Sequence, residues 1–393
     1  AGLRIVQARA ALGISDALVF PQQQQVNGNY SGLYRNEDWY KSANASLDVG
    51  WEMDIWGKYA RGIESAEASL YASIASYRDV LVSISAEIAR NYINYRTAEE
   101  RMFLSQQNIA IQQRVVEMTQ VQYDAGNVSE LDVHQARTQL YATQSSLPQL
   151  NISRAQARNA IAVLLGTLPE EIEPLLALED QREPPDFSQE IAQTGREELQ
   201  AQKYGMYAVI PVAPELQPRI DPQLVMRRPD LQVAELQTRA QSARIGLTEA
   251  DLYPHFVLAG SIGLAGDTFS NQFQSGSGAG FFTPLINWNI FNYGRIKNNV
   301  RAQDARFQQT VVTYQNVVLN AAREVEDGLV GFLRSQEQVG YLETAVTASQ
   351  RSVSLSLEQY RAGTVDNQRV LNSQASLLGQ QDSLAQAKGH IVS

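Results

Sequence analysis

The chain has 393 residues and a formal net charge of -10, with 44% hydrophobic and 19% charged residues. This composition is that of an ordinary folded protein, and the acidic balance argues against a nucleic-acid partner. The sequence has no cysteine, which excludes disulfides and thiolate metal sites, and no apolar run of about 18 residues that could form a transmembrane helix. Any membrane-spanning part would therefore have to consist of β-strands.

Residues 1–19 are predicted to form a helix that is incomplete at its start. They resemble the later part of residues 229–253, where a helix is expected to begin near Pro229 and to run towards Pro254. Because a counterpart of the first turns of that helix is missing, we expect further residues to precede Ala1 in the full protein.

Residues 20–56 are predicted to form a β-hairpin. From Ala43 to Ile55 apolar residues alternate with polar or acidic ones, which is the period of a strand with one apolar face. The strand after Pro21 is less clearly marked, because residues 22–25 are all glutamine. An amphipathic hairpin that covers a soluble core is the alternative, but strands of about ten residues have the length that crosses a membrane at a tilt.

Residues 57–166 are predicted to form a long helical hairpin. No proline or glycine interrupts the chain between Gly62 and Gly126, and apolar residues recur there at intervals of three and four. A single helix would be about 100 Å long, far beyond the average of about 11–12 residues, so a few shorter helices are the alternative. We expect a turn at Gly126 and a returning helix that begins at the N-cap Ser129.

The second half is predicted to repeat this order of elements after an irregular segment. Prolines crowd between Pro169 and Pro254, so residues 167–228 are expected to form an irregular domain with short helices. The remaining segments are a helix over residues 229–253, a second β-hairpin over residues 254–292 and a second long helical hairpin over residues 293–393.

The two halves are copies of each other. A shift of 237 positions (288 minus 51) places Trp51 on Trp288 without a gap. The turn motif Tyr-x-Ala-Gly-x-Val recurs in the same register, beginning at Tyr123 and at Tyr360. A tryptophan and a turn motif in one constant register indicate a duplicated half-protein, with a period far longer than that of a solenoid repeat.

Four strands per chain set a condition on assembly. Four strands cannot close into a barrel, and open edges are not tolerated in lipid, so a barrel would have to be shared between chains. Eight strands give an interior filled by side chains, and three chains with twelve strands are the smallest arrangement that conducts. The predicted fold class is mostly α, with a trimeric twelve-stranded membrane β-barrel continued by a long α-helical tunnel. The residues expected to face lipid are Leu47, Val49, Trp51, Met53, Phe282, Ile286, Trp288 and Ile290.

Five motifs together carry a family resemblance: residues 122–132, 227–231, 250–254, 288–294 and 359–365. They resemble the TolC-like outer-membrane factors, which are exit ducts of tripartite multidrug or metal efflux pumps, and the similarity covers essentially the whole chain. The resemblance implies a homotrimer with an equatorial domain, in the outer membrane of a Gram-negative bacterium and mostly in the periplasm. It implies passive conduction of drugs or other small molecules, gated at the periplasmic tip. The implied partners are a periplasmic adaptor protein, an inner-membrane pump and outer-membrane lipid.

Many such proteins are lipoproteins with an N-terminal lipidated cysteine, and because this sequence has none, lipidation stays open. The resemblance also places the turns of the two helical hairpins at the periplasmic tip. The adaptor contact is thereby assigned to Tyr123, Gly126, Val128, Ser129, Glu130, Leu131 and Asp132 in the first turn, and to Tyr360, Arg361, Ala362, Gly363, Thr364, Val365 and Asp366 in the second.

The resemblance further implies a gate at this tip. Tyr360 matches a position that helps tie the tip shut in the family, whereas Asn372 stands where relatives often have an aspartate. Because the first turn is acidic and the second carries Arg361, we expect charged links between the two. A plain solvated helix end is the alternative for each of these charges. The gate candidates are Asp124, Asp132, Tyr360, Arg361, Asp366 and Asn372.

The sequence offers no catalytic centre. Its three histidines, His134, His255 and His390, lack the spacing of metal ligands, and the glycine-rich residues 276–280 are not followed by the lysine of a phosphate loop. We therefore expect neither enzyme activity nor a cofactor. A soluble coiled-coil adaptor or scaffold remains as an alternative, and it would explain the long helices but not the four alternating strands.

Overall fold

A computed structural model describes residues 1–177, 209–213, 225–266 and 276–393. The chain divides into two compact units. The sheet unit consists of Ala1–Leu81 with Ile220–Arg323, and the hairpin unit of Val82–Arg219 with Glu324–Ser393. Most of the irregular domain expected over residues 167–228 lies outside the described residues.

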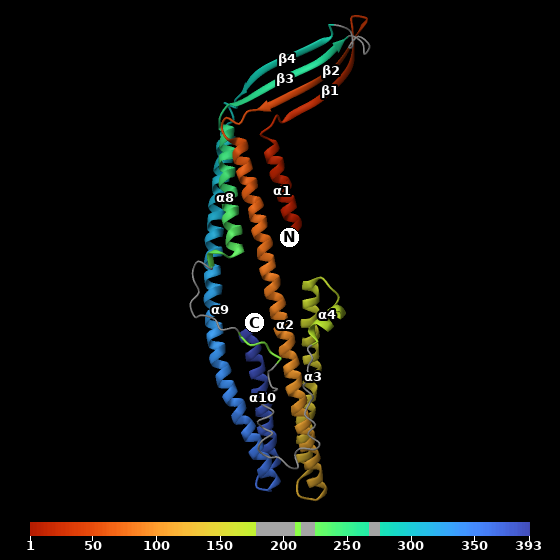
Figure 1. The fold of residues 1–393 in the computed structure, drawn as a ribbon, viewed down its shortest axis with the longest axis vertical. Helices are drawn as coiled ribbons and strands as arrows, with labels where there is room; N and C mark the ends of the chain where they lie inside the picture. The colour runs from red at the N-terminus through yellow and green to blue at the C-terminus, as the bar shows by residue number, and fades with distance from the viewer. Residues whose placement is uncertain (178–208, 214–224, 267–275) are drawn as a thin grey trace. The chain divides into compact units, whose positions relative to one another are not determined.

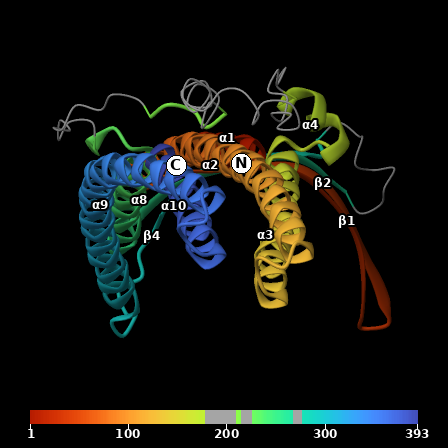
Figure 2. The same ribbon diagram turned by 90° about the horizontal axis from the view of Figure 1, so that it is seen from below.

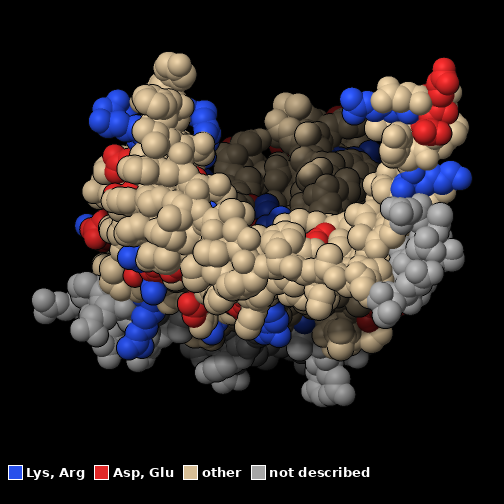
Figure 3. Space-filling view, turned by 90° about the horizontal axis from the view of Figure 1, so that it is seen from above, with Lys and Arg blue, Asp and Glu red and all other residues tan. Residues whose placement is uncertain are grey.

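The sheet unit contains one antiparallel sheet of four strands in the order β1-β2-β3-β4 (Figure 1). β1 (Gln23–Arg35) and β2 (Asp38–Glu52) form the first hairpin, and β3 (His255–Gly266) and β4 (Gly278–Asn287) form the second. Asn36 and Glu37 connect β1 to β2 with φ of 52° and 70°, as a tight two-residue turn requires. In Figure 3 acidic and basic groups gather at this far end of the first hairpin, where the sequence has Arg35 and Asp38.

Helices lead into and out of both hairpins. α1 (Gly2–Ala17) precedes β1, and α8 (Pro229–Glu249) with the short η2 (Ala250–Leu252) precedes β3. After β2 the chain enters α2 (Lys58–Asp124), and after β4 it enters α9 (Arg295–Arg361); each has 67 residues. Within the sheet unit α8 is joined to α9 by a Gln241–Gln303 hydrogen bond of 2.9 Å and to α2 by an Arg244–Ser65 hydrogen bond of 3.3 Å.

The hairpin unit is a layer of helices in the order α9, α10, α2, α3 (Figure 2). α3 (Glu130–Leu165) returns along α2 and is followed by the short α4 (Pro169–Leu176), and α10 (Asn367–Val392) returns along α9. α3 continues through Pro148. Apolar clusters join these helices, and the one nearest the turns draws Val115, Ala136, Tyr360, Val370 and Leu371 from all four long helices.

The architecture agrees with the predicted class of a mostly helical chain with a small antiparallel sheet. Unbroken helices of 67 residues, rather than several short ones, occupy both long stretches that lack proline. None of the described helices is both long enough and apolar enough to cross a lipid bilayer.

Candidate functional site

The sheet has one apolar and one polar face, as its pairing register shows. Paired residues in an antiparallel ladder point to the same side, so Val26, Leu47 and Ile262 share one face because Leu47 pairs with the other two. Val49, Gly260 and Phe282 continue this apolar face across the sheet. Exposed fractions of 79% for Val26 and 70% for Phe282 show that nothing in the described chain covers it.

The opposite face carries the polar residues of the strands, although Leu33, Tyr40, Phe281 and Leu285 also lie on it. Asp48 pairs with Gln25 and Ser261, and its carboxylate accepts hydrogen bonds from Asn27 at 2.5 Å and Ser46 at 3.2 Å. Ser31 and Ser42 pair across the first hairpin with their hydroxyls 2.8 Å apart. Such a face suits contact with water, whereas the apolar one does not.

The register brings most residues predicted to face lipid to one side of the sheet, but three of them lie beyond the strand ends. Leu47, Val49 and Trp51 of β2 share the apolar face with Phe282 and Ile286 of β4. Met53 lies just past β2, although its N–H still bonds the Phe256 carbonyl at 2.9 Å.

The prediction that the alternating strand continues through Trp288 and Ile290 is wrong. β4 ends at Asn287, and the Ile290 N–H bonds the Trp288 carbonyl at 3.1 Å, which turns the chain towards α9. Val26 and Ile262 share the apolar face but are absent from the predicted lipid-facing set. Alternation in β3 could have identified Ile262, but the polar start of β1 conceals Val26.

Tryptophan side chains fasten the strand ends to the helix ends. The Trp51 indole N–H donates to the Val19 carbonyl at 3.0 Å, and the Trp288 indole N–H donates to the Leu252 carbonyl at 3.1 Å. These bonds occupy equivalent places in the two copies. Trp56 adds a third, to the Pro254 carbonyl at 2.8 Å.

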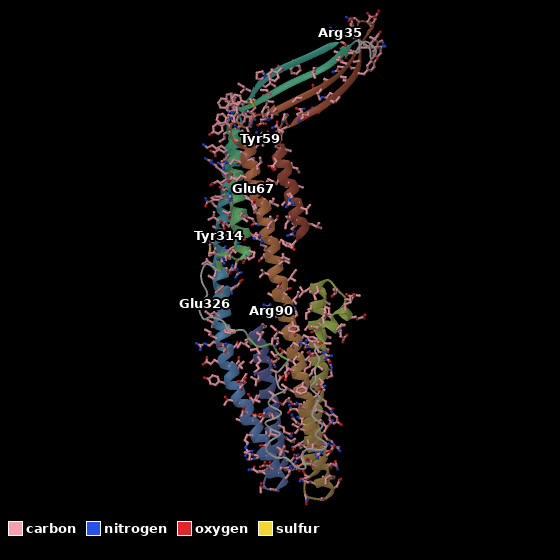
Figure 4. The ribbon with its side chains drawn as sticks, viewed as in Figure 1. Arg35, Tyr59, Glu67, Arg90, Tyr314 and Glu326 are labelled. Carbon is pink, nitrogen blue, oxygen red and sulfur yellow. The ribbon has the colours of Figure 1, made fainter. Side chains whose placement is uncertain are left out.

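A cluster of charged groups lies where β2 and β3 meet α2 (Figure 4 labels Tyr59 there and Arg35 at the far end of the sheet). The His255 Nδ1 is 2.6 Å from Glu52 Oε1, and Lys58 Nζ lies 3.6 Å from the same oxygen and 3.2 Å from Asp251 Oδ1. The Tyr59 hydroxyl donates to Glu52 at 3.0 Å. Burial, together with this carboxylate, raises the pKa of Tyr59. His255 is thus part of the polar junction between the sheet and the start of α2.

The two turns of the hairpin unit share one geometry. Gly126 and Gly363 have φ of 76° and 69°, in the left-handed region that ends helices and that glycine adopts without strain. The Asn127 N–H bonds the Gln122 carbonyl at 2.9 Å, and the Thr364 N–H bonds the Gln359 carbonyl at 3.0 Å. The repeated motif therefore encodes one helix-ending turn twice.

Two of the carboxylates proposed for a gate cap helices. The Asp132 carboxylate accepts from the Ser129 N–H at 2.9 Å and the Ser129 hydroxyl at 2.6 Å, which forms a capping box at the start of α3. Asp366 is the N-cap of α10 and accepts from the Arg369 N–H at 3.1 Å. The residue shift that relates the copies places one N-cap, Ser129, on the other, Asp366.

Replacing Ser129 or Asp366 by Ala is expected to cost about 1 kcal/mol of local helix stability. Ser129→Ala removes the hydroxyl that bonds Asp132 in the capping box, and Asp366→Ala leaves the Arg369 N–H without its acceptor. Amide hydrogen exchange should accelerate in the first turn of α3 or α10, respectively. Ser145→Ala, an exposed mid-helix change in α3, is the control and should leave exchange unchanged. Equal exchange in the capping variants and the parent would show that these caps do not hold the turns.

The other gate candidates differ in exposure. The Asp124 carboxylate accepts from Gln120 Nε2 at 2.9 Å, and Asn372 Oδ1 accepts from Gln368 Nε2 at 2.9 Å. Arg361 is exposed and, in the part of the chain that the structure describes, forms no salt bridge with Asp124 or Asp132. Tyr360 is only 4% exposed, and burial raises its pKa. Within the described chain, therefore, no salt bridge from Arg361 joins the two turns.

A polar connection that the sequence did not predict joins the two helical hairpins. Asn367 is 2% exposed, and its Nδ2 donates to the Asp132 carbonyl at 3.1 Å. Further along α10, Asp382 pairs with Arg101 of α2 at 2.5 Å. Nothing in the sequence pattern distinguishes these polar residues from solvent-facing ones.

A groove lies beside the turns. It has a volume of about 310 Å³, and its lining is mostly apolar with one acidic and one basic residue at the rim. The lining residues are Glu117, Met118, Val121, Gln122, Tyr360 and Arg361. A cavity of this kind can accept an apolar side chain from a partner helix.

Comparison with known proteins agrees with this geometry. The sequence profile of the outer membrane efflux protein family matches residues 1–167 and 222–393, which is most of the chain. The chain belongs to the outer membrane efflux protein family. It is similar to the probable outer membrane lipoprotein SilC of Salmonella typhimurium, with 28% identity over 395 residues that cover 98% of this chain and 77% of SilC.

Two further relatives support the assignment. The cation efflux system protein CusC of Escherichia coli K12 is 26% identical over 390 residues, covering 98% of this chain and 78% of CusC. The solved structure of the outer-membrane channel OprN superposes with a TM-score of 0.84 at 28% identity, covering 99% of this chain and 84% of that chain. Membership of this family confirms the resemblance to TolC-like outer-membrane factors and the outer-membrane location. It also identifies the chain as a channel component rather than an enzyme or a soluble scaffold.

Proposed function

We propose that this chain is one protomer of a trimeric exit duct that conducts small molecules passively from the periplasm through the outer membrane. The observation that carries the proposal is the sheet, which has an exposed apolar face and two unpaired edges. In water such a sheet would be an aggregation site. In a bilayer, closure with other copies satisfies the edges and lipid covers the apolar face.

The sheet would contribute four strands to a barrel of twelve. Its apolar face would meet lipid through Leu47, Val49 and Phe282, and its polar face would line the lumen. The lumenal side chains are neutral amides and hydroxyls together with the charged Asp48 and Glu52 and the apolar Phe281 and Leu285. Such a lining admits chemically varied cargo, so we propose that selection lies in the inner-membrane pump.

The hairpin turns would be the periplasmic tip and the site of the adaptor. The tip residues around Gly126 and Gly363 are exposed, and the adjoining groove offers apolar Met118 and Val121 between the charged Glu117 and Arg361. Relatives such as CusC are named as parts of cation efflux systems. We propose that a periplasmic adaptor docks on these turns and joins the duct to a pump.

Mass measurement in detergent tests the assembly. We expect a particle of three chains with its strands intact, because four strands leave two edges open. A stable monomer whose circular dichroism retains the β signal would contradict the shared barrel. The purified trimer should also form channels in planar bilayers.

The closed state of the tip gives a further prediction. Tyr360→Phe combined with Arg361→Ser is expected to raise single-channel conductance several-fold. Arg361→Ser removes an exposed charge from links between protomers, each worth about 0–1 kcal/mol but present three times, whereas Tyr360→Phe removes a hydroxyl that is buried within the chain, where the tip helices pack. High salt should weaken closure in the parent protein for the same reason.

Tyr123→Phe is the matched control, because Tyr123 occupies the equivalent position in the first copy and is exposed. It should leave conductance unchanged. If the double variant forms intact trimers of unchanged conductance, the constriction lies elsewhere, for instance at an apolar ring within the helical tube.

A further inference from the structure

The two edges of the sheet are complementary in direction and in hydrogen-bonding phase. β1 and β4 lie at opposite edges, and because neighbouring strands alternate in direction, β4 runs antiparallel to β1 of another copy (Figure 1). The Ala265 N–H bonds the Ser277 carbonyl, and the Met53 N–H bonds the Phe256 carbonyl. These two bonds show that the odd-numbered residues of β1 and β4 hydrogen-bond to the neighbouring strands of the same chain. The outward N–H and C=O groups then belong to even-numbered residues on both edge strands.

The internal duplication relates the two hairpins residue by residue. The shift that carries Trp51 to Trp288 carries Val49 to Ile286. Val49 pairs with Gln24 in the first hairpin, and Ile286 pairs with Phe256 in the second, so Gln24 corresponds to Phe256. Four residues further on, Gly28 therefore corresponds to Gly260.

The contact between the hairpins within the chain now serves as a template for the contact between chains. Between β2 and β3, Val49 lies opposite Gly260. Their counterparts are Ile286 on β4 and Gly28 on β1. We infer that β4 of one protomer pairs with β1 of the next in the register that sets Ile286 opposite Gly28. This inference rests on the proposed trimer and adds the register of its subunit contact.

Side-chain sizes support this register independently of the duplication. In each facing pair on the apolar side, a large side chain meets a glycine or a proline. A shift of two residues would instead set Phe282 against Tyr30 or Tyr34 and would leave Gly32 without its aromatic partner. Glycine opposite an aromatic residue is a favourable cross-strand arrangement. The predicted pairs on this face are Ile286–Gly28, Pro284–Tyr30, Phe282–Gly32 and Gly280–Tyr34.

The polar side agrees as well. Thr283 would lie opposite Ser31 and Asn287 opposite Asn27, so that hydroxyl meets hydroxyl and amide meets amide. Pro284 removes one donor from the outward row of β4 in every register and therefore does not favour one over another.

Cysteine cross-linking tests the register, and native thiols cannot interfere because the chain has no cysteine. In the inferred register Ser31 and Thr283 form a non-hydrogen-bonded pair with Cα atoms about 4.5 Å apart, within the reach of a disulfide. Residues displaced by two positions are about 7–8 Å apart, outside that reach. Within one chain the two positions lie on opposite edges of the sheet.

The trimer carrying Ser31→Cys and Thr283→Cys is expected to give covalent dimers and trimers on oxidation, seen on denaturing gels without reductant. Ser31→Cys with Phe281→Cys, and Ser31→Cys with Leu285→Cys, should cross-link at least about tenfold more slowly. Asn27→Cys with Asn287→Cys is a second in-register pair and should behave like the first, which guards against a failure of one variant to fold.

Faster cross-linking of either displaced pair would overturn the register. Absence of cross-links in all four variants, with three chains per particle by mass, would overturn the pairing of β4 with β1 while leaving the proposed duct intact. A monomeric parent protein in detergent would overturn both.

Discussion

Replacing Val49 by Arg is expected to destabilise the assembled sheet by roughly 2–4 kcal/mol if the residue lies near the middle of the bilayer. Val49 is on the apolar face, opposite Gln24 and Gly260, and is 37% exposed in the single chain. A guanidinium there would have to be desolvated by lipid without a partner. The fraction of heat-resistant trimer on cold denaturing gels and the denaturant midpoint of folding in vesicles both measure the loss.

Asn44→Arg is the matched control, because Asn44 is exposed on the polar face of the same strand. It should change stability by much less. Glu52, also on the polar side, is unsuitable as a control since it pairs with His255 and Lys58. Equal losses at Val49 and Asn44 would mean that the two faces have been misassigned, as a register error of one residue would do.

Replacing Arg96 by Met is expected to cost roughly 3 kcal/mol, at the low end of the range for a broken buried ion pair. The Arg96 guanidinium is almost fully buried, donates to the Leu176 carbonyl at 2.7 Å and pairs with Glu99 at 2.7 Å. It also lies over the rings of Tyr92 and Tyr95. The methionine would leave the Leu176 carbonyl unsatisfied where α4 packs on α2. The melting temperature of the detergent-solubilised protein should fall, and protease should cut sooner near α4.

Arg158→Ala supplies the comparison, because Arg158 also reaches α4 but pairs with the exposed Glu173 at 3.4 Å. A surface pair of this kind contributes about 0–1 kcal/mol. The expected order of melting temperatures is parent, then Arg158→Ala close below it, then Arg96→Met well below both. Equal melting temperatures for the two variants would show that burial of Arg96 adds nothing to the attachment of α4.

Local signals in the sequence were sufficient for the elements themselves. Proline is absent from both long stretches that became α2 and α9, and apolar residues recur there with a helical period. The left-handed turns follow from Gly126 and Gly363, because glycine takes that conformation at little cost. Because the chain is duplicated, each element could be predicted from two segments of the sequence. A turn motif and a tryptophan that recur at one constant shift were enough to define the repeat.

The sequence was less informative where a strand stops or where polar residues lie inside. Alternation continues through Trp288 and Ile290, yet β4 ends before them because the chain turns towards α9. The turn motif predicts that Tyr360 is accessible at the tip, but helices α2, α3 and α10 bury it in the cluster with Val115 and Val370. Periodicity reports which face of an element is apolar, not which partner covers it.

By itself, therefore, the sequence determined the elements, their duplication and the family, because each depends on neighbours a few residues apart or on one constant shift. Only the tertiary structure decided the pairings between distant residues. Glu52 meets His255 across 203 positions, and Asn367 meets Asp132 across 235. Such contacts depend on strand register and helix packing, and a shift of one residue in either would replace every partner.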